Sequence, residues 1–155
     1  MRRFGHWIGH WSGPAEFADG AVGTINFALW PLFGGTVLNV EGNSHDAAGT
    51  LRYVGSGLWS MDARGQVIAA TWANQLGGIL LHEEPDDSDA LALAGPLPGN
   101  RRMSTVFRVS NDELFISSAV LEGYGGKSHP RSTGTLRRLG VARGPHRDED
   151  AADAE

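Results

Sequence analysis

The sequence predicts an all-β protein: an antiparallel up-and-down β-barrel of about ten strands, with an open β-sandwich as the alternative. Segments rich in β-branched and aromatic residues recur at about the 8–12-residue spacing typical of such folds. The 22 glycines are spread along the 155 residues, which suits many tight turns. Beyond the first turn no stretch has helical periodicity, so antiparallel pairing is expected, and closure of the sheet would remove its edges.

The chain is expected to open with a short helical plug. Within residues 4–8, apolar side chains have the i, i+3, i+4 spacing of one helical turn. Gly9 then breaks the turn, and residues 10–13 can continue as a strand. Gly9 and Gly13 share a strand face with Trp11 and leave room for its indole, so we expect Trp11 to fill one end of the barrel.

Turn signals divide the remaining chain into strands. The clearest is Asp19-Gly20, because Asp-Gly supplies the positive φ angles that tight hairpins need. Residues 43–49 are interpreted as a polar loop. The predicted strands are residues 12–17, 22–30, 36–42, 51–61, 66–73, 79–84, 90–94, 103–109, 113–121 and 132–139.

The predicted barrel comprises residues 1–140, and residues 141–155 are predicted to form a disordered acidic tail. The tail is rich in Arg, Asp, Glu and Ala and has no apolar pattern. We expect truncation after Gly140 to leave the melting temperature nearly unchanged. A clear drop in a thermal melt would show instead that the tail docks on the barrel.

Composition narrows the class of protein. The net charge is −5, and the acidic tail carries much of it, so the barrel is close to neutral and is not expected to bind nucleic acid. The absence of cysteine excludes disulfides and thiolate metal sites. No long apolar run follows the two N-terminal arginines, so no signal peptide is expected. The sequence has no stretch of about 18 apolar residues, so no membrane span is expected either, and the expected location is the cytoplasm. The oligomeric state is left open, and a homodimer is one alternative.

Several short motifs resemble a bacterial family of lipocalin-like (calycin-type) β-barrels of unknown function. The resemblance implies a ligand-sized barrel in which one closing arginine stacks on Trp11. The motifs are Gly9-x-Trp11-x-Gly13, the Trp30…Gly34-Gly35 step, the segment 57–62 entering a turn, and the closing pair Arg137 and Arg138.

A weaker similarity links the chain to the nitrobindin family of ten-stranded haem barrels. It rests on Trp7-x-Gly9-x-Trp11-x-Gly13 and on the run from 107 to 139. The resemblance implies a haem cofactor with His129 as its axial ligand, because that family places its haem-ligating histidine shortly before the last strand. Without this resemblance, no cofactor is expected.

Aromatic residues suggest that the barrel encloses a cavity. A barrel of this size holds either packed side chains or one small ligand. Small residues lie near the aromatic ones, with Gly55 and Gly57 close to Trp59 and Ala70 beside Trp72, although a filled core is the alternative. The candidate ligand-binding residues are Trp30, Tyr53, Trp59, Trp72 and Phe107, with Phe33 and Phe115 as further aromatic candidates.

Three polar residues are candidates for acid–base catalysis. His82 and Glu84 alternate with Leu80, so all three face inward if Leu80 does, and His82 and Glu84 could then exchange protons with a ligand. The alternative places His82 outside. Glu41 is a weaker candidate general acid, with an exposed position as its alternative. The six histidines lack the spacing of a metal site, so none is predicted.

These observations favour a barrel that binds a small hydrophobic or aromatic molecule in its cavity. Two alternatives remain. One is an enzyme, such as a cyclase, isomerase or hydratase, that uses the barrel as a reaction chamber for a hydrophobic metabolite. The other is a nitrobindin-like haem-binding protein.

Overall fold

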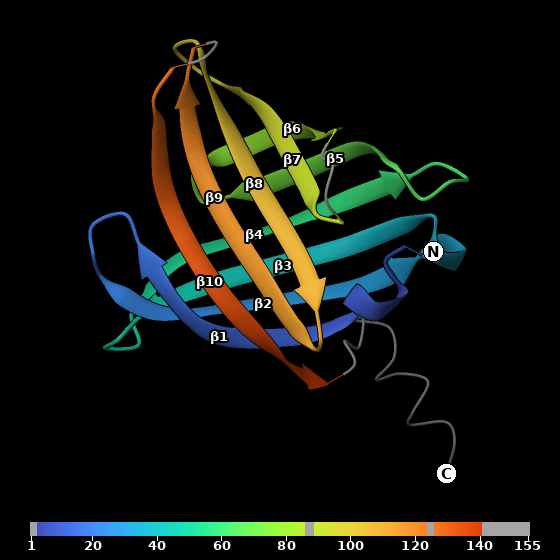
Figure 1. Cartoon of the computed structure of the whole chain (residues 1–155), viewed down its shortest axis with the longest axis horizontal. Coiled ribbons are helices and arrows are strands. Elements are labelled where there is room, and N and C mark those ends of the chain that lie inside the picture. The colour runs from blue at the N-terminus through green and yellow to red at the C-terminus, as the bar shows by residue number, and fades with distance from the viewer. Residues whose placement is uncertain (1–2, 86–88, 124–125, 141–155) are drawn as a thin grey trace.

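The computed structural model describes residues 3–85, 89–123 and 126–140, in which ten antiparallel strands form a closed barrel (Figure 1). Each strand pairs with its neighbour in sequence, and β10 returns to pair with β1. The predicted up-and-down barrel is confirmed; residues 141–155 lie outside the described residues. The strands are β1 (Gly9–Phe17), β2 (Val22–Leu32), β3 (Val37–Asp46), β4 (Leu51–Met61), β5 (Val67–Asn74), β6 (Gly77–Glu84), β7 (Leu91–Leu97), β8 (Arg101–Ser110), β9 (Glu113–Glu122) and β10 (Ser128–Gly140).

β3 is longer than the sequence predicted, because it continues through most of the expected polar loop at residues 43–49. On the outside of the barrel, Asn43 joins a row of polar side chains that crosses β1, β2 and β3. Ser12 donates a hydrogen bond to Asn26 at 2.7 Å, and Asn26 donates to Asn43 at 2.9 Å. Cross-strand polar pairs of this kind stabilise a solvent-facing strand surface, so a polar segment can remain a strand.

The barrel is closed at the end where β1 begins. The 3-10 helix η1 (Gly5–Trp7) lies there, opposite the β1–β2 turn in Figure 1. Trp11 is 1% exposed, and its Nε1 donates to the carbonyl of Trp7 at 2.9 Å. The Arg138 guanidinium lies 4.3 Å from the Trp11 ring centroid and donates to two backbone carbonyls of the plug. The predicted arginine–indole stack is therefore confirmed, with Arg138 as the stacking residue.

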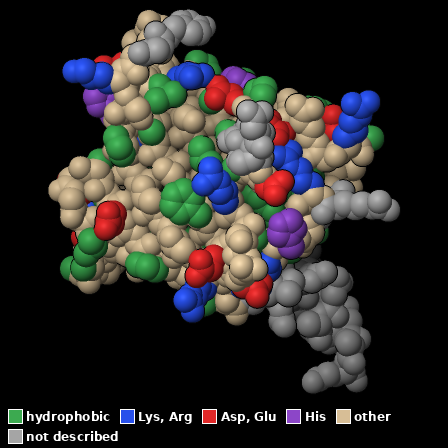
Figure 2. Space-filling model, viewed as in Figure 1, with side chains coloured by type: hydrophobic (Ala, Val, Ile, Leu, Met, Phe, Trp, Pro, Cys, Tyr) green, Lys and Arg blue, Asp and Glu red, His purple; other side chains and the backbone are tan. Residues whose placement is uncertain are grey.

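The opposite faces of the strands separate core from solvent. Phe4, Leu29, Leu38, Leu114 and Leu136 have no exposed surface and pack with Trp7 and Trp11 inside the closed end. A second 3-10 helix, η2 (Phe33–Gly35), connects β2 to β3. On the face shown in Figure 2, acidic and basic side chains are interspersed. Within the described residues, no helix is long and apolar enough to cross a membrane.

Candidate functional site

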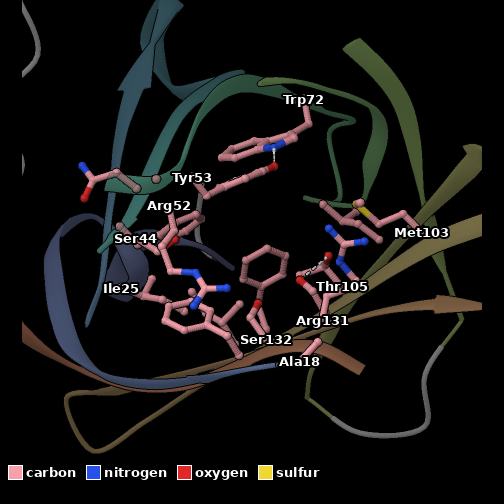
Figure 3. A pocket seen from close by; sticks show the side chains of 18 of the residues that line it. Ala18, Ile25, Ser44, Arg52, Tyr53, Trp72, Met103, Thr105, Arg131 and Ser132 are labelled. Atoms are coloured by element: carbon pink, nitrogen blue, oxygen red, sulfur yellow. Dashed lines mark hydrogen bonds between the residues drawn. The ribbon is translucent and has the colours of Figure 1, made fainter. Parts of the chain in front are cut away.

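A cavity of about 380 Å³ occupies the other half of the barrel, where β1 ends and β2 begins (Figure 3). Its volume falls within the roughly 300–1,000 Å³ range of small-molecule pockets. Its lining side chains come from strands all around the barrel, because inward-facing residues of every strand converge there. Trp11 and Trp7 do not line it, since they pack in the closed end.

The strand register arranges the lining residues in two rings. The ring nearer the mouth consists of Ile25, Ser44 and Tyr53 on β2–β4 and Leu93, Thr105, Ser118 and Ser132 on β7–β10. The deeper ring consists of Phe27 and Gly42 on the first side and Phe107 and Ile116 on the second. Five of these seven upper residues carry a hydroxyl group, whereas the deeper ring has none.

Aromatic side chains form the floor of the cavity. Trp59 is 1% exposed and meets Phe107 edge-on with ring centroids 5.2 Å apart. Phe27 lies 5.5 Å from Phe107, and Phe4 of the plug packs 6.1 Å from Trp59. Edge-to-face and tilted contacts at such distances are favourable. The floor is therefore a rigid aromatic surface that separates the cavity from the filled end.

The Tyr53 hydroxyl is the best-organised polar group in the cavity. It accepts hydrogen bonds from Trp72 Nε1 and, at 2.9 Å, from Asn74 Nδ2. Asn74 Oδ1 in turn accepts from the Leu76 backbone N–H at 2.8 Å, which fixes the orientation of the amide. A tyrosine oxygen has two acceptor sites and one proton, so the Tyr53 proton is left to donate to something else.

Trp72 forms a wall of the cavity by lying over a glycine of the adjacent strand. A β-carbon at Gly55 would come within 2.4 Å of the Trp72 ring. The Trp72 ring is also nearly parallel to that of Tyr53, with an interplanar angle of 11° (Figure 3). The sequence associated Gly55 with Trp59; in the structure Gly55 makes room for Trp72 instead.

Two arginines and one aspartate lie at the mouth. Arg52 pairs with Asp19 at 2.9 Å and lies 4.3 Å from the Phe17 ring centroid. The hydrogen bond from Arg52, together with one from the Ala21 backbone, lowers the pKa of Asp19 below its ordinary value. Arg131 also lines the cavity, near Thr105 and Ser132 in Figure 3.

Four of the five predicted ligand-binding aromatics, Tyr53, Trp59, Trp72 and Phe107, line the cavity. The prediction for Trp30 is wrong. Ile25, Phe27 and Leu29 occupy the inner face of β2, so alternation places Trp30 on the outer face, where it packs with Ala28 and Leu32. Of the further candidates, Phe33 is 79% exposed, and Phe115 lies between the inward-facing Leu114 and Ile116 and so faces outward.

The structure also corrects the placement of His82 and Glu84. Leu81 lines the cavity, so its neighbours Leu80 and His82 point outward, and their side chains are 72% and 64% exposed. Glu84 shares this outer face, 4.0 Å from His82, and pairs with Arg102 at 2.6 Å.

Glu41 is on the outside as well. Val40 is fully buried, and Gly42 lines the cavity, so the residue between them is exposed. A different irregularity affects β5, where regular alternation would place Ile68 on the same face as Trp72. Ile68 is 61% exposed, because a bulge between Val67 and Ala70 shifts the alternation.

His129 does not fit the role of a haem ligand. Its side chain is 51% exposed and lies 3.4 Å from Glu122 at the rim of the barrel. Among the described residues, no histidine lines the cavity. The described part of the cavity wall thus offers no imidazole to a porphyrin iron, and its lining does not fit a haem.

Sequence reasoning missed the residues at the mouth, Arg52, Arg131 and Asp19, and the hydroxyl ring beneath them. Pro130 was the one available signal for Arg131, because proline within a strand indicates an edge or a bulge. Nothing in the local sequence distinguishes Arg52 from other solvent-facing arginines.

Comparison with known proteins shows the fold. The crystal structure of Rv2717c from M. tuberculosis has a TM-score of 0.65 and 15% sequence identity, and the alignment covers 90% of this chain and 98% of that one. A de novo designed fluorescence-activating β-barrel has a TM-score of 0.48 and 13% identity, over 90% of this chain and 100% of its own. No protein-family model and no curated protein matches the chain.

Proposed function

We propose that this protein binds a small hydrophobic or aromatic molecule inside the barrel. The observation that carries the proposal is the half-filled interior: a cavity of about 380 Å³ above an aromatic floor, in a barrel whose other end is plugged. Burial of an apolar ligand there would contribute about 25 cal/mol for each Å² removed from water. The resemblance to lipocalin-like barrels agrees with this proposal, because such barrels enclose one small ligand.

The geometry favours binding over catalysis. The hypothesis of an enzyme that uses the barrel as a reaction chamber relied on three candidate catalytic residues. All three lie on the outer face: His82, Glu84 and Glu41. Among the described residues, the groups that line the cavity include neither histidine nor glutamate. No specific observation therefore favours the cyclase, isomerase or hydratase alternative, or the haem alternative.

A cavity-filling substitution tests the proposal. We expect the neutral fluorophore N-phenyl-1-naphthylamine to bind the wild-type protein with a stoichiometry of one. Ser118→Phe should abolish this binding, because the new ring would occupy the cavity that Ser118 lines. Ser117→Phe is the matched control, since Ser117 is the next residue of β9 and faces outward. Fluorescence titration measures both variants.

The same two variants show which result would contradict the proposal that the fluorophore binds inside the barrel. Equal loss of binding in both, or binding to folded Ser118→Phe that matches the wild type, would place the fluorophore outside the barrel and overturn the proposal. Circular dichroism establishes that each variant is folded. Native mass spectrometry of the protein as purified would then identify a ligand carried from the cell.

A further inference from the structure

Both arginines at the mouth are placed there by β-bulges. On β4, Tyr53 pairs with Ser44 and Leu51 pairs with His45, so Arg52 is the extra residue between them. On β10, Ser132 pairs with Ser118 and Pro130 pairs with Ala119, so Arg131 is the extra residue there. Regular alternation would turn both side chains outward, because Tyr53 and Ser132 face inward. A bulge can redirect a side chain, and both arginines instead line the cavity.

The charge at the mouth is only partly balanced. Asp19 is the single acidic residue among the described residues that line the cavity, and it is bound to Arg52. Arg131 makes no ion pair or side-chain hydrogen bond within the described residues. Among the described lining residues, the mouth therefore carries one unmatched positive charge, although the chain as a whole has a net charge of −5.

The charged and hydroxyl groups of the cavity are concentrated towards the mouth, although Phe17, Leu93 and Met103 also line that part. The arginines stand above the ring of hydroxyl groups, which includes Ser44, Thr105 and Ser118, and the aromatic floor lies below. The Tyr53 hydroxyl belongs to the upper ring and has its proton free to donate. Proton donors and positive charge thus gather at one end of a cavity whose other end is apolar.

We propose that the ligand is an amphipathic organic anion, held with its apolar body on the aromatic floor and its anionic group at the mouth beside Arg131. This inference rests on the proposed function and specifies the class of ligand. Arginine suits an oxyanion such as a carboxylate or sulfonate, because its planar guanidinium donates parallel hydrogen bonds to two oxygens. The hydroxyl ring would accommodate the linking polar atoms between the two ends.

Two fluorophores with the same apolar body separate the contribution of the anionic group to binding from that of the body. N-phenyl-1-naphthylamine is neutral, and 8-anilinonaphthalene-1-sulfonate carries an added sulfonate. We expect Arg131→Gln to weaken sulfonate binding about two- to fivefold, which is the range for an exposed ion pair, because Arg131 is exposed at the mouth. It should leave binding of the neutral fluorophore unchanged. Raising the ionic strength should weaken the binding of the sulfonate fluorophore but not that of the neutral one, because salt screens an exposed ion pair.

Two further variants sharpen the test. Asp19→Asn removes the negative charge at the mouth and releases Arg52, so it should strengthen sulfonate binding; asparagine retains the oxygen that accepts from the Ala21 N–H. Arg108→Gln is the matched control for charge, because Arg108 is exposed on the outer face of β8. It should change neither affinity.

The outcomes distinguish the two proposals. If the neutral fluorophore binds and Arg131→Gln alters neither affinity, or alters both alike, the anion proposal is overturned and the binding function stands. The same holds if Arg108→Gln weakens sulfonate binding as much as Arg131→Gln does, because the effect would then reflect net charge. If neither fluorophore binds the wild-type protein, the proposed binding function itself fails.

Discussion

Replacing Trp11 with alanine is expected to lower the free energy of unfolding by about 3–5 kcal/mol, as for other large-to-small changes in cores. The indole is 1% exposed, donates a hydrogen bond to the Trp7 carbonyl and lies under the Arg138 guanidinium. Its removal would leave a void at the closed end and detach the plug from the last strand. Urea denaturation followed by circular dichroism measures the loss.

Leu80→Ala is the control for this substitution. Leu80 is 72% exposed on the outside of β6, and its truncation should change the free energy of unfolding by less than about 0.5 kcal/mol. A loss below about 1 kcal/mol for Trp11→Ala would contradict the account of the closed end, because it would make Trp11 peripheral to the stability of the barrel.

Replacing Gly55 with alanine is expected to collapse the wall of the cavity. The added β-carbon would come within 2.4 Å of the Trp72 ring and 2.9 Å of its Nε1, so the indole must move from its present position in the wall. Overpacking of this kind costs about 1–3 kcal/mol of stability. Affinity for N-phenyl-1-naphthylamine should fall about tenfold, equivalent to about 1.4 kcal/mol. Fluorescence titration and denaturation measure the two effects.

Gly78→Ala provides a matched glycine control on β6, the strand that pairs with the other side of β5. A β-carbon at Gly78 meets only the Trp72 carbonyl oxygen, at the ordinary contact distance of 3.8 Å. This variant should bind like the wild-type protein. If Gly55→Ala binds the fluorophore as tightly as Gly78→Ala does, then Trp72 does not shape the binding cavity.

The ten strands and the closed end could be predicted from the sequence because the signals for them are local. Asp19-Gly20 and similar turn residues impose backbone geometry within a few positions. The spacing of Gly9, Trp11 and Gly13 likewise defines one face of one strand. The resemblance to lipocalin-like barrels added the partner of Trp11, which the structure identifies as Arg138.

The cavity could be predicted only in part. Tyr53, Trp59, Trp72 and Phe107 line it as expected, since large aromatic side chains in a small barrel favour its interior. Which of its two faces each strand turns inward, here called the phase of the strand, could not be predicted in the same way. A period of two residues shows which residues share a face, but not whether that face is inside, and the predictions for Trp30 and His82 depended on this choice.

Only the tertiary structure decided which face of each strand points inward and where the alternation breaks. Phase depends on the summed packing of all ten strands, so Leu81 rather than His82 entered the interior. A bulge depends on how two strands pair, which the sequence of one strand alone does not show. The bulges at Arg52 and Arg131 bring both arginines to the mouth. By itself the sequence determined the strands, their turns and the plugged end of the barrel. The polar mouth of the cavity arises only when the sheet closes.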